Sequence, residues 1–165
     1  MTKASALTGL IGAGLFTLIG LLNGAHGVAI PRLPLFGAAL GVIALIDLRE
    51  HRIPNRIVLP ATAVCAVLAG PAALRHSLPA LALVTLLLVL ASAQPAALGM
   101  GDVKQALLIA LALGAAATSA LLLGFALAAL VGIALTIRRG RSALDTALPL
   151  APFLAAGATI AIALT

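Results

Sequence analysis

The sequence has few of the residues on which many soluble, disulfide-bonded or metal-binding domains depend. It contains no Trp or Tyr, one cysteine (Cys65), and only four acidic residues among 165. One cysteine excludes an intrachain disulfide and a cysteine zinc cluster. The net charge is +6, but the basic residues lack neighbouring aromatic side chains on which bases could stack. No nucleic-acid partner is therefore expected.

Apolar residues dominate what is present. Hydrophobic residues make up 63% of the chain and charged residues 8%, with a mean hydropathy of +1.25. This composition is typical of a protein whose solvent is the lipid bilayer. Because a helix needs roughly 20 apolar residues to cross the bilayer, the chain can make at most six or seven crossings. No linker divides it. We therefore predict one integral-membrane domain over residues 1–165, an all-α polytopic bundle in contact with lipid.

The apolar runs predict seven membrane-spanning helices. Their expected ranges are 5–22, 34–48, 57–74, 77–94, 103–116, 118–137 and 146–164. The hardest assignment is the uncharged stretch of 33 residues from Gln105 to Ile137. As one helix it would be roughly 50 Å long, which is too long for a single crossing. We predict a break between Gly114 and Ser119 that divides it into two short helices.

The distribution of basic residues supports seven spans with the N-terminus inside. Two basic residues, Arg32 and Arg75, then lie outside. Eight lie inside: Lys3, Arg49, Arg52, Arg56, Lys104, Arg138, Arg139 and Arg141. This is a strong positive-inside bias, whereas an unbroken long helix would leave five on each side. The four acids also fall inside: Asp47, Glu50, Asp102 and Asp145. We therefore expect any chemistry of these groups at the cytoplasmic face.

Two of the acids occupy related positions at the membrane boundary. Asp47 follows the apolar run 41–46, and Asp102 precedes the run that starts at Val103. Two spans separate them, so both return to the same face and can converge on one water molecule. Taken singly, Asp102 fits a helix N-cap and Asp47 fits an interfacial acid facing a nearby arginine. As a pair near a membrane, where acids are rare, they are a candidate functional site.

Two carboxyl groups that are close together in a poorly solvated site share a proton, and their apparent pKa values separate. This is the arrangement found in aspartic proteases. Asp47 is expected near the C-terminus of a helix and Asp102 near the N-terminus of another. The helix dipoles then favour the protonated form of Asp47 and the carboxylate of Asp102.

Three segments form a pattern along the chain. Asp47 is followed by Ile53-Pro54-Asn55, then come Gly99-Met100-Gly101-Asp102-Val103-Lys104 and, near the end, Leu148-Pro149-Leu150-Ala151-Pro152-Phe153. The pattern resembles the type IV prepilin peptidases, and Gly99 to Asp102 match the GxGD motif of membrane aspartic peptidases. Most of the chain is covered by this resemblance.

The resemblance implies a multi-pass protein of the bacterial cytoplasmic membrane in which Asp47 and Asp102 are the catalytic pair. They would activate water to cut a prepilin or pseudopilin, at the cytoplasmic face, between a short basic leader and the hydrophobic helix that follows. Neither metal nor cofactor is implied. The chain lacks the cysteine-containing insertion of the family's long form, which also methylates the product, so methylation is not predicted. The short form resembles the peptidases of tight-adherence pilus systems.

Five further residues are expected to support the site. Gly99 and Gly101 permit close approach of the substrate beside Asp102, or form an ordinary flexible turn. Pro54 and Asn55 are expected to shape the loop after Asp47. Lys104 either tunes the carboxyl groups or extends to lipid headgroups, and we favour the headgroups.

Two other classes of function are compatible with the sequence. In an ion- or proton-coupled transporter, Asp47 and Asp102 would bind an ion or relay protons. No third acid continues a path across the bilayer, which weakens this alternative. The other class is a non-catalytic assembly factor for pili or secretion, which would retain its function after Asp-to-Asn substitution. The sequence gives no indication of the oligomeric state.

Overall fold

The computed structural model describes residues 3–24, 29–95, 98–140 and 148–165. These residues contain seven α-helices and no strand, which confirms the all-α prediction. The helices are α1 (Lys3–Leu22), α2 (Ala29–Glu50), α3 (Asn55–His76), α4 (Leu78–Ala93), α5 (Met100–Leu113), α6 (Ala117–Arg139) and α7 (Ala151–Ala163). Arg141 and Asp145 lie outside the described residues.

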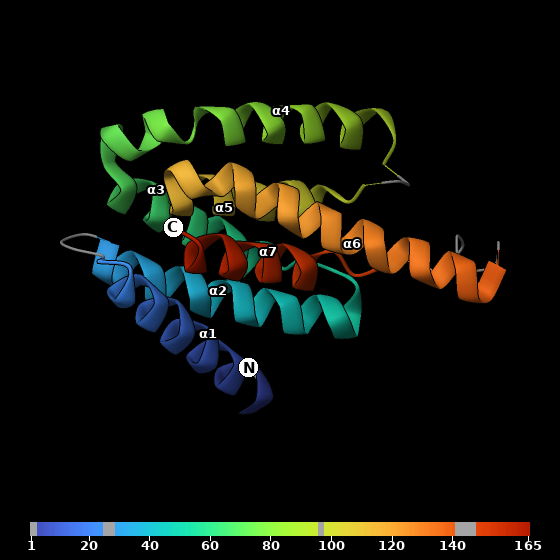
Figure 1. Ribbon diagram of the computed structural model, residues 1–165, viewed down its shortest axis with the longest axis horizontal. Helices are drawn as coiled ribbons and strands as arrows, with labels where there is room; N and C mark the ends of the chain where they lie inside the picture. The colour runs from blue at the N-terminus through green and yellow to red at the C-terminus, as the bar shows by residue number, and fades with distance from the viewer. Residues whose placement is uncertain (1–2, 25–28, 96–97, 141–147) are drawn as a thin grey trace.

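Consecutive helices run in opposite directions, so their ends gather at two opposite ends of an elongated bundle (Figure 1). One end, on the right of Figure 1, holds the C-terminal ends of α2 and α6 and the N-terminal ends of α3, α5 and α7. We call it the acidic end, because Asp47, Glu50 and Asp102 belong to these helix ends. The opposite end holds the start of α2 and the turn between α3 and α4, with Arg32 and Arg75. Among the described residues, Asp47, Glu50 and Asp102 are therefore separated from Arg32 and Arg75 as the sequence predicts, while Arg141 and Asp145 are not described.

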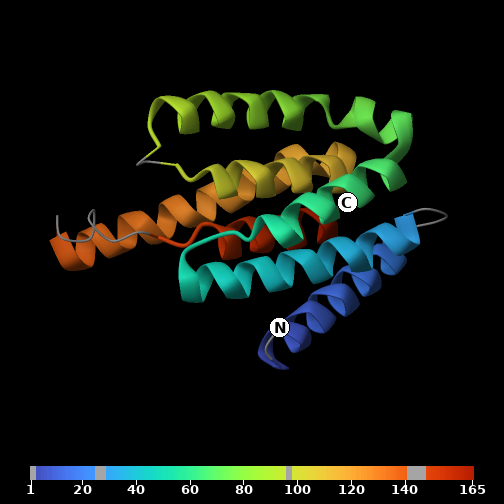
Figure 2. The ribbon, with the colours of Figure 1, turned by 180° about the vertical axis from the view of Figure 1, so that it is seen from behind.

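The long uncharged stretch is divided where the sequence predicts it. Helix α5 ends at Leu113, Gly114–Ala116 form a short 3-10 helix (η1), and α6 begins at Ala117. Gly114 has φ +58°, a left-handed conformation that glycine adopts without a steric penalty. The chain reverses at this point, and α6 returns beside α5 (Figures 1 and 2). The break is thus confirmed.

Two apolar helical segments of the described chain are long enough to cross a membrane by length and composition. One is Lys3–Leu22, and the other is Met100–Arg139, which comprises α5 and α6 and contains the reversal at Gly114. Three further apolar helices are shorter: Asn55–Pro71, Leu78–Ala93 and Ala151–Ala163. The helices agree in number with the predicted spans, while the number that cross the bilayer stays a prediction.

Several helix boundaries differ from those expected. Helix α2 begins at Ala29 rather than near residue 34 and continues through Pro34. Helix α3 is kinked at Gly70, where φ is +69°. Helix α7 begins at Ala151, later than the expected residue 146, so residues 148–150 form a non-helical approach to it. Residues 146 and 147 lie outside the described part of the chain.

Glycines set the closest helix contacts. A Cβ atom on Gly12 of α1 would collide with the backbone of Gly37 in α2, and a Cβ on Gly37 would collide with Gly12. Gly157 of α7 is in similar backbone contact with Gly124 of α6. In lipid, helices associate through such close packing, because apolar surfaces gain little from leaving an apolar solvent. The two glycine pairs therefore hold α1 to α2 and α6 to α7.

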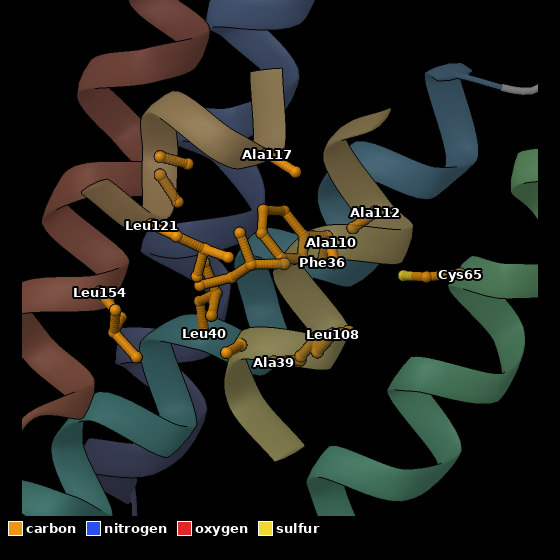
Figure 3. Close-up of a cluster of buried hydrophobic side chains, with 14 of the residues drawn as sticks. Phe36, Ala39, Leu40, Cys65, Leu108, Ala110, Ala112, Ala117, Leu121 and Leu154 are labelled. Atoms are coloured by element: carbon orange, nitrogen blue, oxygen red, sulfur yellow. The ribbon is translucent and has the colours of Figure 1, made fainter. Parts of the chain in front are cut away.

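The core lies where α2, α5, α6 and α7 meet (Figure 3). Its larger side chains include Phe36 and Leu40 from α2, Leu108 from α5, Leu121 from α6 and Leu154 from α7, all at most 1% exposed. Small alanines fill the spaces between them, so the helices approach closely. This packing fixes α2, α5 and α7 relative to one another, and these three helices supply the side chains described next.

Candidate functional site

Asp47 lies in the last turn of α2 and is only 5% exposed. The helix ends three residues later, where His51 takes φ +49° and its amide donates to the Asp47 carbonyl at 2.9 Å. The side chain points into the bundle rather than toward a nearby arginine. Its Oδ2 accepts a hydrogen bond from the backbone amide of Ala151 at 3.0 Å. Asp47 is therefore a buried acid with a backbone partner, not a surface acid.

Asp102 lies in the first turn of α5 and is partly buried. Gly99 is the N-cap of this helix, with φ −73° and ψ 140°, so Asp102 is the third helical residue rather than the cap itself. The Asp102 amide donates to the Gly99 carbonyl at 3.1 Å, and the Gly99 amide donates to the Asp102 carboxylate. This exchange resembles a capping box, in which an acid at the third position reaches back to the cap.

The two carboxyl groups are close enough to interact electrostatically. Asp47 comes from the end of α2 and Asp102 from the start of α5, as the sequence predicts for a converging pair. Two like charges in a partly desolvated site repel each other, and sharing a proton relieves that repulsion. A pair that interacts in this way can share one proton.

Helix α7 changes the electrostatic surroundings of Asp47. Ala151 is the first residue of α7, and the amides of a first helical turn have no partner inside their own helix. The amide of Ala151 donates a hydrogen bond to Asp47, so the positive end of the α7 dipole faces the Asp47 carboxyl group. This effect opposes the dipole of α2, from which the protonated form of Asp47 was predicted. Which carboxyl group holds the shared proton stays a prediction.

Gln105 lies one turn beyond Asp102 on α5 and is 0% exposed. Its Nε2 donates to the carbonyl oxygen of Ala151 at 3.1 Å. Its Oε1 is buried without a hydrogen-bond partner. Ala151 is thus hydrogen-bonded through its amide to Asp47 and through its carbonyl to Gln105.

Gly99 and Gly101, two of the expected supporting residues, are each close to other atoms at the start of α5. A Cβ atom on Gly99 would lie 3.1 Å from Asp102 Oδ2, and one on Gly101 would lie 2.9 Å from the Cβ of Ile53. Ile53 belongs to the segment between α2 and α3. The glycines therefore allow α5 to begin against this segment, with the Asp102 carboxyl group folded back over its own turn.

Lys104 and Asn55 form a second connection between the same elements. Lys104 Nζ donates to Asn55 Oδ1 at 2.9 Å, in exposed surroundings. Asn55 is the first residue of α3 and Pro54 is its N-cap, with φ −75°. The hydrogen bond thus links the start of α5 to the start of α3. It gives Lys104 a protein partner, and the headgroup contact that we favoured from the sequence stays a prediction.

The remaining charged groups at the acidic end lie on the surface. Glu50 and Arg52 form an exposed ion pair at 3.7 Å, and His51 is exposed. Within the described residues, no three His, Cys, Asp or Glu side chains cluster in a way that could hold a metal ion.

Sequence reasoning missed Ala151 and Gln105 as parts of the site. Gln105 could have been noticed as an uncharged polar residue three positions after Asp102, on the same helical face, at the start of a long apolar run. Ala151 contributes only backbone atoms, so its side chain gives no indication of its role. The Pro149 to Phe153 segment marked the region without identifying the contact.

The fold and the site together define an all-helical protein with long apolar segments and a pair of interacting carboxyl groups at one end of its bundle. Residues 34–137 match the type IV leader peptidase family, and this range covers more than half of the chain and includes Asp47 and Asp102. The chain belongs to the type IV leader peptidase family. Helix α7, which supplies the Ala151 amide, lies beyond the matched range. No curated protein and no solved structure matches the chain.

Proposed function

We propose that the chain is an aspartic endopeptidase that removes the leader peptide from prepilin or pseudopilin precursors at the cytoplasmic face of the bacterial plasma membrane. The observation that carries this proposal is the electrostatic interaction between Asp47 and Asp102 in a member of the leader peptidase family. Asp47 is buried and held by Ala151, and Asp102 is held by the first turn of its own helix.

The proposed reaction uses one ionised and one protonated carboxyl group. The carboxylate accepts a proton from a water molecule as the water oxygen attacks the carbonyl carbon of the scissile peptide bond. The protonated carboxyl group donates its proton to the carbonyl oxygen, which gives a neutral tetrahedral intermediate. When the C–N bond breaks, the leaving nitrogen takes up the proton that the first carboxylate had accepted. The other carboxylate takes back a proton from a hydroxyl group of the intermediate, so the C=O bond re-forms and the starting pair is restored. The reaction needs neither a metal nor a covalent intermediate.

The lengths of the helices suit a substrate that is cut close to its membrane helix. Helix α5 has 14 residues and α7 has 13, so each is roughly 20 Å long and shorter than a full crossing. Helix α6 has 23 residues and extends past them at the acidic end (Figure 1). If the end of α6 marks the membrane surface, Asp102 and Ala151, at the starts of α5 and α7, lie slightly inside the membrane. A peptide bond next to a membrane-embedded helix can reach such a depth.

The transporter alternative has less support. A relay across the bilayer needs acids at successive depths. Asp47, Glu50 and Asp102 all belong to the acidic end, and the opposite end carries Arg32 and Arg75. A non-catalytic assembly role has no specific observation in its favour. Two acids close together in a partly desolvated site are costly to maintain, which favours a use for their charge.

Co-expression tests the proposed function. A prepilin from the same genome is expressed with the wild-type chain and with Asp47→Asn or Asp102→Asn, and leader removal is followed by the change in prepilin size. We expect processing by the wild type and none by either variant. Matched membrane levels of the three proteins are required for the comparison.

Glu50→Gln is the matched control. It removes an acid three residues from Asp47 that is exposed and paired with Arg52. Processing should continue in this variant. Processing that persists in both Asp variants would refute the peptidase and favour the assembly role, whereas ion flux abolished by the same variants would favour the transporter.

A further inference from the structure

We propose that Gln105 is a positioning residue of the site, which holds the start of α7 so that the Ala151 amide meets Asp47. The effect of Gln105 on catalysis rests on the proposed function. Its hydrogen bond to Ala151 does not depend on that function. Gln105 is not assigned a chemical step.

The hydrogen bonds form a continuous connection between the helices that bear the two acids. Gln105 Nε2 of α5 donates to the Ala151 carbonyl at 3.1 Å, and the Ala151 amide of α7 donates to Asp47 Oδ2 of α2 at 3.0 Å. Asp102 lies one turn before Gln105 on the same helix. A displacement of α7 would therefore alter the placement of Asp47 relative to Asp102.

This connection matters because α2 and α5 touch each other little directly. Helix α7 packs against both and makes more contact with α2 than α5 does. Farther along, α7 is held against α6 through the backbone contact of Gly157 with Gly124. At its N-terminal end, Gln105 supplies the side-chain hydrogen bond to α5. Helix α3 also packs against both α2 and α5, so the relative position of the two acids depends on α3 and on where this end of α7 lies.

The orientation and the burial of the Gln105 amide support a specific role. A backbone carbonyl can only accept, so the NH₂ group of Gln105 must face Ala151 and Oε1 must face away. That oxygen is buried and unpartnered, in a side chain that is 0% exposed. An aliphatic side chain would fill this position without burying an unpaired polar atom. Packing alone therefore gives no reason for a glutamine here.

Gln105→Met tests the inference, because methionine has nearly the same length but cannot donate to the Ala151 carbonyl. Gln105→Leu is a second variant of different shape. Each protein is purified in detergent, and kcat and KM are measured separately on a prepilin. Hydrogen–deuterium exchange is followed in the peptide over residues 148–155. The control is Ser77→Ala, which also removes a buried hydrogen bond from a side chain to a backbone carbonyl, here that of Ala73, at the opposite end of the bundle.

We expect kcat to fall between about tenfold and a hundredfold in Gln105→Met, with KM within about twofold, because misplacement of an acid affects the transition state more than binding. Exchange at residues 148–155 should become faster, and Ser77→Ala should change neither. Wild-type kcat or unchanged exchange in Gln105→Met would overturn the inference.

Failure of both Gln105 variants to fold, beside a normal Ser77→Ala, would also overturn it, because the residue would then stabilise the bundle rather than the site. If the wild-type chain cleaved no prepilin, the proposed function would be refuted. The hydrogen–deuterium exchange measurement alone would then decide whether Gln105 positions α7.

Discussion

The backbone amide of Ala151 donates a hydrogen bond to the Oδ2 of Asp47, 3.0 Å away and 104 positions earlier in the sequence. This contact places the N-terminus of α7 against a buried acid at the end of α2. Amides and the positive end of a helix dipole stabilise negative charge at such a position. Asp47 is therefore bound by a helix that lies outside the part of the chain that matches the leader peptidase family.

Replacing the Ala151 amide by an ester tests this contact, because incorporation of lactic acid at position 151 removes the N–H and keeps the side chain. A hydrogen bond to a charged group contributes roughly 1.5–3 kcal/mol, so we expect stability to fall by up to that amount and cleavage by about tenfold or more. The control is the same replacement at Leu164, whose amide bonds to Ile160 in the last turn of α7. Equal cleavage by both ester proteins would contradict a role for the Ala151 amide.

Gly101→Ala is expected to disturb the start of α5 by collision with Ile53. The added Cβ would lie 2.9 Å from the Ile53 Cβ, and overpacking of this kind costs about 1–3 kcal/mol. Ile53→Gly removes that Cβ and should relieve the collision, so the double variant should be more stable and more active than Gly101→Ala alone. Thermal unfolding and prepilin cleavage of the four proteins form the test. Additive losses would show that the two residues do not compete for space.

The hydrogen bond between Lys104 and Asn55 is expected to matter little for stability. Both groups lie in exposed surroundings, where such a contact contributes at most about 1 kcal/mol. Lys104→Met and Asn55→Ala should each leave cleavage within about threefold of the wild type, and the double variant should show a coupling below about 1 kcal/mol. Loss of cleavage in Lys104→Met with Asn55→Ala unaffected would mean that Lys104 acts on the carboxyl groups or the substrate.

Gly12 and Gly14 lie on the same helix but differ in their surroundings. A Cβ on Gly12 would collide with the backbone of Gly37, whereas a Cβ on Gly14 would meet nothing within 4 Å. Gly12→Ala should therefore force α1 away from α2 and destabilise the protein by about 1–3 kcal/mol. Gly14→Ala should be neutral or stabilising by up to about 1 kcal/mol, because alanine favours a helix more than glycine does. Thermal stability in detergent distinguishes the two, and equal values would refute the close contact.

Much of the fold could be predicted because apolar runs and charges report directly on membrane helices. The break near Gly114 followed from the length of the uncharged run, and the structure has a reversal there. The boundaries were less predictable. The second span was expected to begin at residue 34, but α2 begins at Ala29 and continues through Pro34, since tertiary packing outweighs the loss of one backbone hydrogen bond.

The site was only partly predictable. Asp47 and Asp102 could be paired because two spans return the chain to the same face, and the structure brings them into electrostatic contact. The surroundings of Asp47 were not predictable, because its partner is a backbone amide of a distant helix. Any residue at position 151 other than proline would offer that amide. The dipole of α7, which acts on Asp47 against that of α2, could not be predicted for the same reason.

Cleavage by purified protein in liposomes tests the central claim most directly. The wild-type chain and its Asp47→Asn and Asp102→Asn variants are each reconstituted with one purified prepilin, and the products are identified by mass spectrometry. The account predicts that the wild type releases a leader cut immediately before the hydrophobic helix, and that both variants release none while retaining wild-type thermal stability. Release of the same leader by either variant at the wild-type rate would contradict the assignment of Asp47 and Asp102 as the catalytic pair.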